Sequence, residues 1–356
     1  MYDVIVIGAR VAGSPTAMLL ARAGHKVLLV DKATFPSDKL STHYIHPEGV
    51  RRLQEWGLLE TLLATNVPEI RTFTVFAGDT QVMQPPLDGI AYCPRRYLLD
   101  KILVDAAEAA GAELRSGFHV DEVTMDGEQV TGIVGRGRAG AVVTESARFV
   151  VGAEGHHSLL AKTVKAPTYR DREALTGAYY SYWSGVPMDG AHVYLSDRGG
   201  VLAFPTNDGR VCIAAGASRD QFAEYKKDIE GRFFHILEGA PRFAAKVRAG
   251  KREERWMGSA DVPNFFRKPF GPGWALVGDA GYMKDPVTGY GITDAFRDAT
   301  LLAAALDDTL SGRIPAEEAL AGYQAKRDAA ALPVYEMTLM MASGEASSLF
   351  GAPQPA

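Results

Sequence analysis

The chain begins with two short apolar runs separated by a helical pattern. Tyr2 to Ile7 form the first run, which ends at Gly8, and Val27 to Val30 form the second, which ends at Asp31. Between them, residues 12–23 place apolar side chains at helical spacing. Continuous apolar runs are typical of buried strands, whereas a period of 3.6 residues is typical of a helix with one packed face. The pattern predicts a strand, a tight turn, a helix and a strand, which is the order of a βαβ unit.

Further along, the pattern separates helical blocks from strand-rich ones. We expect amphipathic helices at 46–59 and 95–111, and further helices at about 221–237, 291–310 and from about 315. Glycine-punctuated alternation over 112–151 predicts a β-meander, and strands are expected around 73–76, within 174–217 and at 274–280. Asn207, Asp208 and Gly209 favour a hairpin turn, because these residue types tolerate positive φ.

These blocks indicate an α/β fold built around a Rossmann-like nucleotide-binding domain. We expect that domain to be assembled from residues 1–70, 93–170 and 259–330. A β-sheet substrate domain of residues 71–92 and 171–258 is inserted into it, and residues 331–356 form a C-terminal helix and tail.

Composition and charge exclude several classes of protein. Apolar residues make up 47% of the 356 residues, enough for a substantial core, and the net charge is −5 with no basic stripe, so we expect no nucleic-acid partner. The two cysteines, Cys93 and Cys212, lack ligand spacing, which favours a reducing cytoplasm and no metal site. No run approaches the ~18 apolar residues of a transmembrane helix, and the start lacks a signal-peptide pattern. A cytoplasmic location is expected.

The turn after the first strand has most features of a dinucleotide-binding fingerprint. It has glycine at the first and third expected positions, Gly8 and Gly13, with Ala12 before the latter, whereas Arg10 replaces the middle glycine. Glycines there permit a tight bend and close approach to a pyrophosphate. Asp31 ends the next strand, where a carboxylate can accept hydrogen bonds from an adenosine ribose, and Lys32 follows it. Arg10 either obstructs the pyrophosphate or adds positive charge to its site, and both interpretations stay open.

A second motif points to FAD. Residues 274–280 read Trp-Ala-Leu-Val-Gly-Asp-Ala and residues 285–292 read Asp-Pro-Val-Thr-Gly-Tyr-Gly-Ile. Together they resemble the second flavin motif of the p-hydroxybenzoate hydroxylase and geranylgeranyl reductase superfamily. The resemblance implies that Asp279 holds the ribityl chain of FAD. It also implies that Pro286, Gly289, Gly291 and Ile292 approach the flavin ring, where a helix N-terminus stabilises negative charge.

Two further segments resemble motifs of the same superfamily. Residues 96–103 match its Arg-x-x-Leu-Asp-x-x-Leu helix start, which implies that Arg96 lies near the pyrophosphate, although Arg95 could take that place. Residues 152–158 resemble its Gly-Ala-Asp-Gly-x-x-Ser motif, with Glu154 in place of aspartate. That motif is linked in hydroxylases to both FAD and the nicotinamide donor, and Glu154 departs from it. The superfamily as a whole implies NAD(P)H as the electron donor.

The resemblance implies a monooxygenase that inserts oxygen into an organic substrate through a peroxyflavin. Aromatic residues on the predicted strands could wall an apolar pocket for an aromatic or polyketide-like molecule, or could pack the sheet against a helix; the candidates are Tyr180, Tyr182, Trp183 and Phe204. Residues 37–43 fall where relatives place a loop beside the flavin ring. Thr42 and His43 are therefore expected to line that site, with His43 a candidate catalytic group or a structural histidine.

Two other functions compete with this one. A reductase of isoprenoid double bonds would use the same flavin motifs. A non-catalytic flavin sensor would bind the cofactor without turning over a substrate. The tryptophan-rich signature of the family's halogenases is absent from the sequence, which disfavours halogenation. Lipid substrates would need a membrane-binding surface, for which residues 337–341, rich in methionine, are the candidate; such methionines more commonly pack in a core. The oligomeric state is left open.

Overall fold

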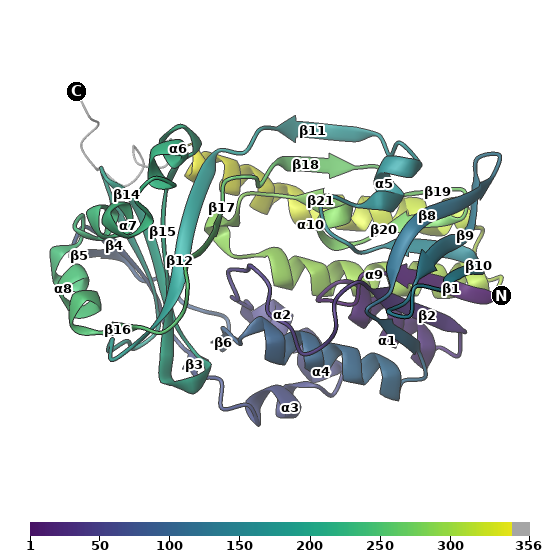
Figure 1. Cartoon of the computed structure of the whole chain (residues 1–356), viewed down its shortest axis with the longest axis horizontal. Coiled ribbons are helices and arrows are strands. Elements are labelled where there is room, and N and C mark those ends of the chain that lie inside the picture. The colour runs from purple at the N-terminus through teal and green to yellow at the C-terminus, as the bar shows by residue number, and fades with distance from the viewer. Residues whose placement is uncertain (344–356) are drawn as a thin grey trace.

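The computed structural model describes residues 1–343 and confirms the predicted α/β fold (Figure 1). Its first sheet has the strand order β19-β20-β10-β1-β2-β7. The strands are β1 (Tyr2–Ile7), β2 (Val27–Asp31), β7 (Glu113–Ser116), β10 (Val142–Gly152), β19 (Phe270–Gly271) and β20 (Trp274–Leu276). All neighbours on this path pair in parallel except β19 and β20. The strands come from distant parts of the chain, so the sheet is assembled from separated segments.

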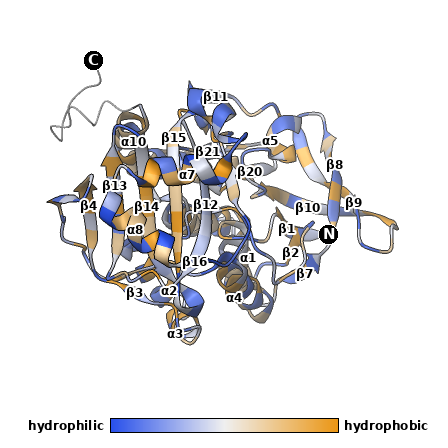
Figure 2. Ribbon diagram, turned by 60° about the vertical axis from the view of Figure 1, so that its left-hand side comes forward, coloured by the Kyte–Doolittle hydropathy of each residue, from blue (hydrophilic) through white to orange (hydrophobic). Residues whose placement is uncertain are grey.

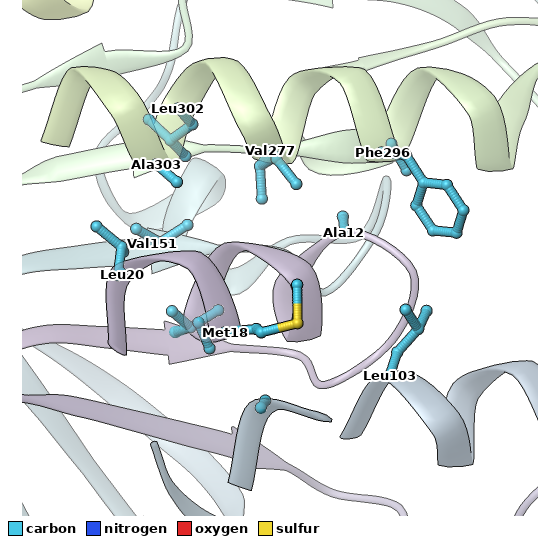
Figure 3. Close-up of a cluster of buried hydrophobic side chains, with 14 of the residues drawn as sticks. Ala12, Met18, Leu20, Leu103, Val151, Val277, Phe296, Leu302 and Ala303 are labelled. Atoms are coloured by element: carbon cyan, nitrogen blue, oxygen red, sulfur yellow. The ribbon is translucent and has the colours of Figure 1, made fainter. Parts of the chain in front are cut away.

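The predicted βαβ unit is present, with helix α1 (Gly13–Arg22) between β1 and β2. This helix lies between α4 (Arg96–Ala109) and α9 (Gly291–Leu310), as Figure 3 shows. Met18 on α1, Leu103 on α4 and Phe296 on α9 are buried in one hydrophobic cluster. Burial of large apolar side chains stabilises such a core by about 1.5–3 kcal/mol each. The core therefore fixes the position of the turn at the N-terminus of α1.

The second sheet has the order β16-β12-β15-β14-β13-β4-β5, with β17 pairing β12. Its strands are β4 (Phe73–Ala77), β5 (Thr80–Met83), β12 (Thr176–Ser184), β13 (Ala191–Ser196), β14 (Gly199–Thr206), β15 (Arg210–Ser218), β16 (Lys251–Arg252) and β17 (Met257–Ser259). The predicted hairpin turn is confirmed between β14 and β15, where Asp208 has a φ of 63°. The domain boundaries stay a prediction.

The predicted single helix at 221–237 is divided into shorter helices, which cover one face of the second sheet. The structure has η2 (Arg219–Gln221), α6 (Phe222–Tyr225) and a separate α7 (Ile229–Leu237), followed by α8 (Pro241–Ala249). The carboxylate of Asp228 accepts a hydrogen bond from the amide of Gly231, so Asp228 caps α7 and starts a new helix there. Figure 2 shows both hydrophobic and hydrophilic residues on α7 and α8, as expected for helices with one buried face.

The predicted helix at 46–59 is also shorter than expected. Helix α2 (Pro47–Glu55) ends before Gly57, which has a φ of 75°, and α3 (Leu59–Leu63) follows. The remaining elements include the predicted meander of β8 (His119–Asp126), β9 (Gln129–Arg136) and β10. The others are β3 (Glu69–Ile70), β6 (Ala91–Tyr92), α5 (Leu159–Thr163), β11 (Thr168–Arg172), η1 (Asn207–Gly209), β18 (Asn264–Arg267), η3 (Gly278–Ala280), β21 (Tyr282–Met283) and η4 (Pro286–Thr288).

The last helix, α10 (Ala316–Ala342), packs beside α9 (Figure 1). Met337 and Met340 on it are 44% and 43% exposed, so the interpretation of these methionines as core packing is wrong. They lie on the side of the helix opposite Tyr335 and Thr338, which are buried. No helix within residues 1–343 is long and apolar enough to cross a membrane. The predicted C-terminal tail, residues 344–356, lies outside the described residues.

Candidate flavin site

The turn between β1 and α1 requires glycine at both of its ends. Gly8 has a φ of 103°, and a Cβ added there would lie 2.6 Å from the carbonyl oxygen of Ala153. A Cβ on Gly13 would lie 1.8 Å from the carbonyl oxygen of Gly8. The backbone therefore folds back on itself and against the end of β10, as a dinucleotide-binding turn must.

The N-terminus of α1 is open to an anion. Its N-cap residue, Ala12, contributes no side-chain hydrogen bond, and no acidic residue lies in the first turn. The first amide groups of a helix have no partner within the helix and carry a partial positive charge. These features fit the pyrophosphate of FAD.

Asp31 lies where the sequence predicted, at the end of β2. Its two carboxylate oxygens accept hydrogen bonds from the amides of Ala9 and Ala33, each at 2.7 Å. A carboxylate has about four acceptor positions, so this one can still accept hydrogen bonds from a ribose. Lys32 beside it is exposed.

The side chain of Arg10 extends toward helix α4. Its guanidinium pairs with Asp100 and also donates hydrogen bonds to Ser37. Asp100 is fully buried and accepts hydrogen bonds from Arg96 as well, at 3.0 and 3.2 Å. One carboxylate thus holds both arginines. Asp100 is part of the Arg-x-x-Leu-Asp-x-x-Leu motif, but the sequence pattern did not predict its pairing with both arginines.

Positive charge gathers around the turn. Burial lowers the pKa of Lys39, and the charges of Arg10, Lys32 and Arg96 lower it further. Such like charges repel each other, and the carboxylates of Asp100 and Asp31 offset only part of that repulsion. A pyrophosphate would offset the rest, so the four side chains fit the phosphates of FAD. Lys39 was missed by the sequence reasoning, although it lies in the loop that was expected beside the flavin.

Asp279 lies in η3 with its side chain open to solvent. Burial by surrounding atoms nevertheless raises the pKa of Asp279, while the charges of Lys284, Arg96 and Lys39 oppose that rise. The side chain is therefore exposed to solvent while protein atoms surround its carboxyl group. It accepts no hydrogen bond from any residue within 1–343. An acceptor without a protein partner fits the hydroxyl groups of a ribityl chain.

The N-terminus of α9 provides a second open helix end. Pro286 begins η4, which Asp285 caps, and Gly289 follows with a φ of 68°. The N-cap of α9, Tyr290, makes no side-chain hydrogen bond, and a Cβ added to Gly291 would meet no atom within 4 Å. The adjacent Ile292 is buried in the core. The amides of this helix end are free to bind the electron-rich edge of a flavin ring.

Glu154 has a local function. Its Oε1 accepts a hydrogen bond from the amide of Leu160 in α5 at 3.1 Å, and burial raises the pKa of Glu154. Ser158 caps the same helix through the amide of Ala161. These contacts stabilise the end of β10 near the phosphate turn. Direct contact of Glu154 with a cofactor stays a prediction.

The aromatic residues of β12 divide between the two faces of the sheet. Trp183 stacks on Phe233 of α7, with ring centroids 5.8 Å apart. Tyr180 and Tyr182 point to the other face, because alternate residues of a strand do so, and join Phe204 in a separate cluster. The structure therefore separates Trp183 from the other three pocket candidates. The separate cluster, which we call the aromatic face, also contains Tyr44, Cys93 and Cys212.

His43 lies against the aromatic face. It is fully buried, has a φ of 60°, and its Nε2 shares a hydrogen bond with the hydroxyl of Tyr182. Burial and the charge of Arg96 lower the pKa of His43 to about 3, so the imidazole is neutral at ordinary pH. Thr42 beside it is half-buried.

Arg95 belongs to the aromatic face rather than to the phosphate turn. Its guanidinium lies 3.7 Å from the ring centroid of Tyr182 and pairs with Asp38 and Glu254. Of the two arginines that open α4, Arg96 is therefore the one beside Arg10 and Lys39. This arrangement favours Arg96 for the pyrophosphate.

One group of side chains within residues 1–343 has the residue types of a cation site. His156, His157 and Asp261 bring their ligand atoms within 4.8 Å of one another. Each histidine Nε2 lies 3.9 Å from the carboxylate of Asp261. The sequence did not indicate this grouping, because Asp261 is distant along the chain. The absence of a metal site stays a prediction.

An open helix end, a ribose acceptor and a second flavin motif define the class of FAD-binding oxidoreductases. The chain belongs to the family described as FAD binding domain, which it matches over residues 1–338. Digeranylgeranylglycerophospholipid reductase 2 of Methanopyrus kandleri is 29% identical over 82% of this chain and 73% of its own length. Menaquinone reductase of Mycolicibacterium smegmatis is 30% identical over 85% of this chain and 75% of its own.

Solved structures share the fold at lower identity. The myxobacterial halogenase CndH matches with a TM-score of 0.88 and 22% identity, over 94% of this chain and 81% of its own. PqsL of Pseudomonas aeruginosa in complex with 2-aminobenzoylacetate matches with a TM-score of 0.82 and 22% identity, over 96% of both chains. The protein is an FAD-dependent oxidoreductase of a superfamily that contains reductases, halogenases and monooxygenases.

Proposed function

We propose that the protein is an FAD-dependent monooxygenase, a hydroxylase or epoxidase, that acts on an aromatic or polyketide-like small molecule with NAD(P)H as reductant. The observation that carries the proposal is the aromatic face. Tyr44, Tyr180, Tyr182 and Phe204 are buried together where the second sheet meets the loop expected beside the flavin. Aromatic rings bind flat apolar molecules by stacking and edge contacts. A fold shared with PqsL, whose structure holds a small aromatic compound, supports the same substrate class.

The residues of this chain would bind the cofactor at both ends. Gly8, Gly13 and Asp31 would hold its adenosine diphosphate half, with Arg10 and Arg96 beside the phosphates. Asp279 would hold the ribityl chain, and the amides at Gly291 would bind the flavin ring. FAD, when bound, supplies the electrons that activate dioxygen. The protein's own contribution is to orient the substrate against the ring and to exclude water.

The fate of oxygen tests the proposal. Phenolic and polycyclic aromatic compounds are screened for stimulated oxidation of NADH and of NADPH, and the best compound is converted under isotopically labelled oxygen gas. A monooxygenase places one labelled atom in the product. Stimulated oxidation that yields only hydrogen peroxide with every compound contradicts the proposed substrate class.

A second candidate function is the reduction of isoprenoid double bonds. It is supported by the relatives that reduce digeranylgeranylglycerophospholipid or menaquinone, at 29% and 30% identity. Such a reductase delivers a hydride and a proton to an alkene and needs no oxygen. Anaerobic reduction of an isoprenoid alkene by the purified protein would favour this function over the monooxygenase. The non-catalytic sensor finds no support among these relatives, which are enzymes.

A further inference from the structure

Two adjacent side chains at the aromatic face each keep a polar atom without a partner. The Nδ1 atom of His43 and the hydroxyl of Tyr44 are shielded from water and form no hydrogen bond within residues 1–343. The two residues are only 0% and 3% exposed. Buried polar atoms are nearly always hydrogen-bonded, because an unsatisfied one retains its full desolvation cost. Two such atoms on consecutive residues therefore indicate a missing partner.

The surroundings offer these atoms no alternative partner. The ring of His43 lies beside Tyr180 and Tyr182, with centroids 5.9 and 5.7 Å away. The ring of Tyr44 lies beside Phe73 and Phe204, with centroids 6.3 and 6.1 Å away. These four neighbours belong to the second sheet. The ring of His46 also lies beside Tyr44, with centroids 4.6 Å apart, but its Nε2 is already bonded to the carbonyl oxygen of Thr288. The unpartnered atoms thus lie among rings that form no hydrogen bond with them.

The direction of the histidine is fixed. Its Nε2 is engaged by the hydroxyl of Tyr182, and the left-handed backbone at His43 sets where the ring lies. Only Nδ1 is left for another molecule. Because either ring nitrogen of a neutral imidazole can carry the proton, Nδ1 can donate to a carbonyl oxygen or accept from a hydroxyl.

Electrostatics select a neutral partner. Burial keeps the imidazole of His43 neutral and raises the pKa of the Tyr44 hydroxyl, so both groups are uncharged. The two cations whose charges act on His43 already pair with carboxylates, Arg95 with Asp38 and Glu254 and Arg96 with Asp100. A substrate carboxylate would have to compete with these partners and would keep much of its desolvation cost.

We propose that His43 and Tyr44 bind an oxygen substituent of the substrate, which is a flat and largely apolar molecule with a hydroxyl or carbonyl group. This inference rests on the proposed function, which makes the aromatic face the substrate site. Its test measures binding and requires no catalytic turnover. The two residues are the polar end of the aromatic face. They orient the substrate and favour an aromatic ring that carries a hydroxyl or carbonyl group over the same ring without one.

The test measures binding of three probes to the FAD-loaded protein by calorimetry: 2-naphthol, naphthalene and 2-naphthoate. We expect 2-naphthol to bind about tenfold more tightly than either of the others, the worth of one or two hydrogen bonds. Tyr44→Phe and His43→Asn, in which asparagine tolerates the positive φ, should each remove most of that preference. Tyr179→Phe is the matched control, because Tyr179 lies on the same strand but packs against Phe222 on the opposite face. It should keep the preference.

Flavin content is recorded for every variant. Full FAD occupancy with a lost preference for 2-naphthol supports the inference. An unchanged preference in both variants, no preference in the unaltered protein, or loss of FAD in step with loss of probe binding overturns it. In the last case the unpartnered atoms bind the cofactor instead. The labelled-oxygen experiment can fail while this one succeeds, so the two proposals are tested separately.

Discussion

At the scale of single residues, Asp279 is the clearest test of the flavin site. Its side chain is exposed, and its carboxylate accepts no hydrogen bond from residues 1–343. A charge-assisted hydrogen bond is worth roughly 1.5–3 kcal/mol. We expect Asp279→Ala to weaken FAD binding about ten- to hundredfold, measured by flavin fluorescence on dialysis. Glu317→Ala on the surface of α10 is the control, and equal occupancy in the two variants would assign Asp279 a structural role.

Arg10 is the residue at which the sequence departs from the fingerprint. Its pairing with Asp100 turns the guanidinium away from the turn's backbone yet keeps it beside Lys39 and Arg96. If the charge acts on the pyrophosphate, Arg10→Gly and Arg10→Gln should both lower FAD affinity, by about tenfold. Arg136→Gln on β9 is the exposed control. A rise in affinity for Arg10→Gly would show that the side chain obstructs the cofactor.

The buried His43 makes a specific prediction about pH. Its pKa is about 3 in the folded protein, against ~6.5 in an unfolded chain. Between these values the unfolded state binds the extra proton, so the free energy of unfolding falls as the pH drops, by at most about 1.4 kcal/mol per pH unit. Urea unfolding at several pH values between 4 and 7 should show a smaller pH dependence for His43→Asn than for the unaltered protein.

A second buried group acts in the opposite direction. Burial raises the pKa of Asp298 to about 6, so its contribution to stability is lost as the pH rises from about 4 to 6. The comparison between His43→Asn and the unaltered protein cancels this contribution, because Asp298 is present in both. His235→Asn, at an exposed position on α7, is the control. An equal pH dependence in all three proteins would contradict the lowered pKa of His43 as the cause.

At the scale of elements, the turn between β1 and α1 depends on the absence of a side chain. A Cβ at Gly13 would lie 1.8 Å from the Gly8 carbonyl oxygen, so Gly13→Ala should cost about 1–3 kcal/mol of stability or more and abolish FAD binding. Gly322 in α10 has no atom within 4 Å of its added Cβ. Gly322→Ala should therefore stabilise the protein by roughly 0.5–1 kcal/mol. Thermal unfolding of the two variants checks whether stability falls in the first and rises in the second.

Strand alternation explains why one pocket candidate differs from the others. The sequence Tyr-Tyr-Ser-Tyr-Trp at 179–183 shows that the strand is aromatic, but not which face meets the cofactor domain. The pairing of β12 with β15 fixes that choice and turns Trp183 toward Phe233. A one-residue shift would exchange the two faces, because side chains alternate strictly along a strand.

At the scale of the whole molecule, FAD binding should stabilise the folded state. The residues expected to hold the cofactor lie on β2, α1, α4 and α9, which are distant in the chain and adjacent in space (Figure 1), and on η3, which packs against α9. A ligand that binds only the folded state adds about 2.7 kcal/mol at a concentration of 100 Kd. We expect the purified protein to be yellow, to release FAD rather than FMN on denaturation, and to melt several degrees higher with FAD than without it. FMN lacks the adenosine half, and equal stabilisation by FMN would contradict the role of Gly8, Gly13 and Asp31.

The sequence by itself determined the βαβ unit, the FAD-binding class and the long helices, because each depends on local signals. Apolar periodicity, glycine spacing and a carboxylate at a strand end can be read within about thirty residues. Tertiary structure alone decided three other features. It paired Arg10 and Arg96 through Asp100, turned Trp183 rather than Tyr182 toward α7, and placed His43 and Tyr44 against the second sheet. These contacts join residues far apart in the chain. Their geometry depends on the packing of the two sheets, which no local pattern contains.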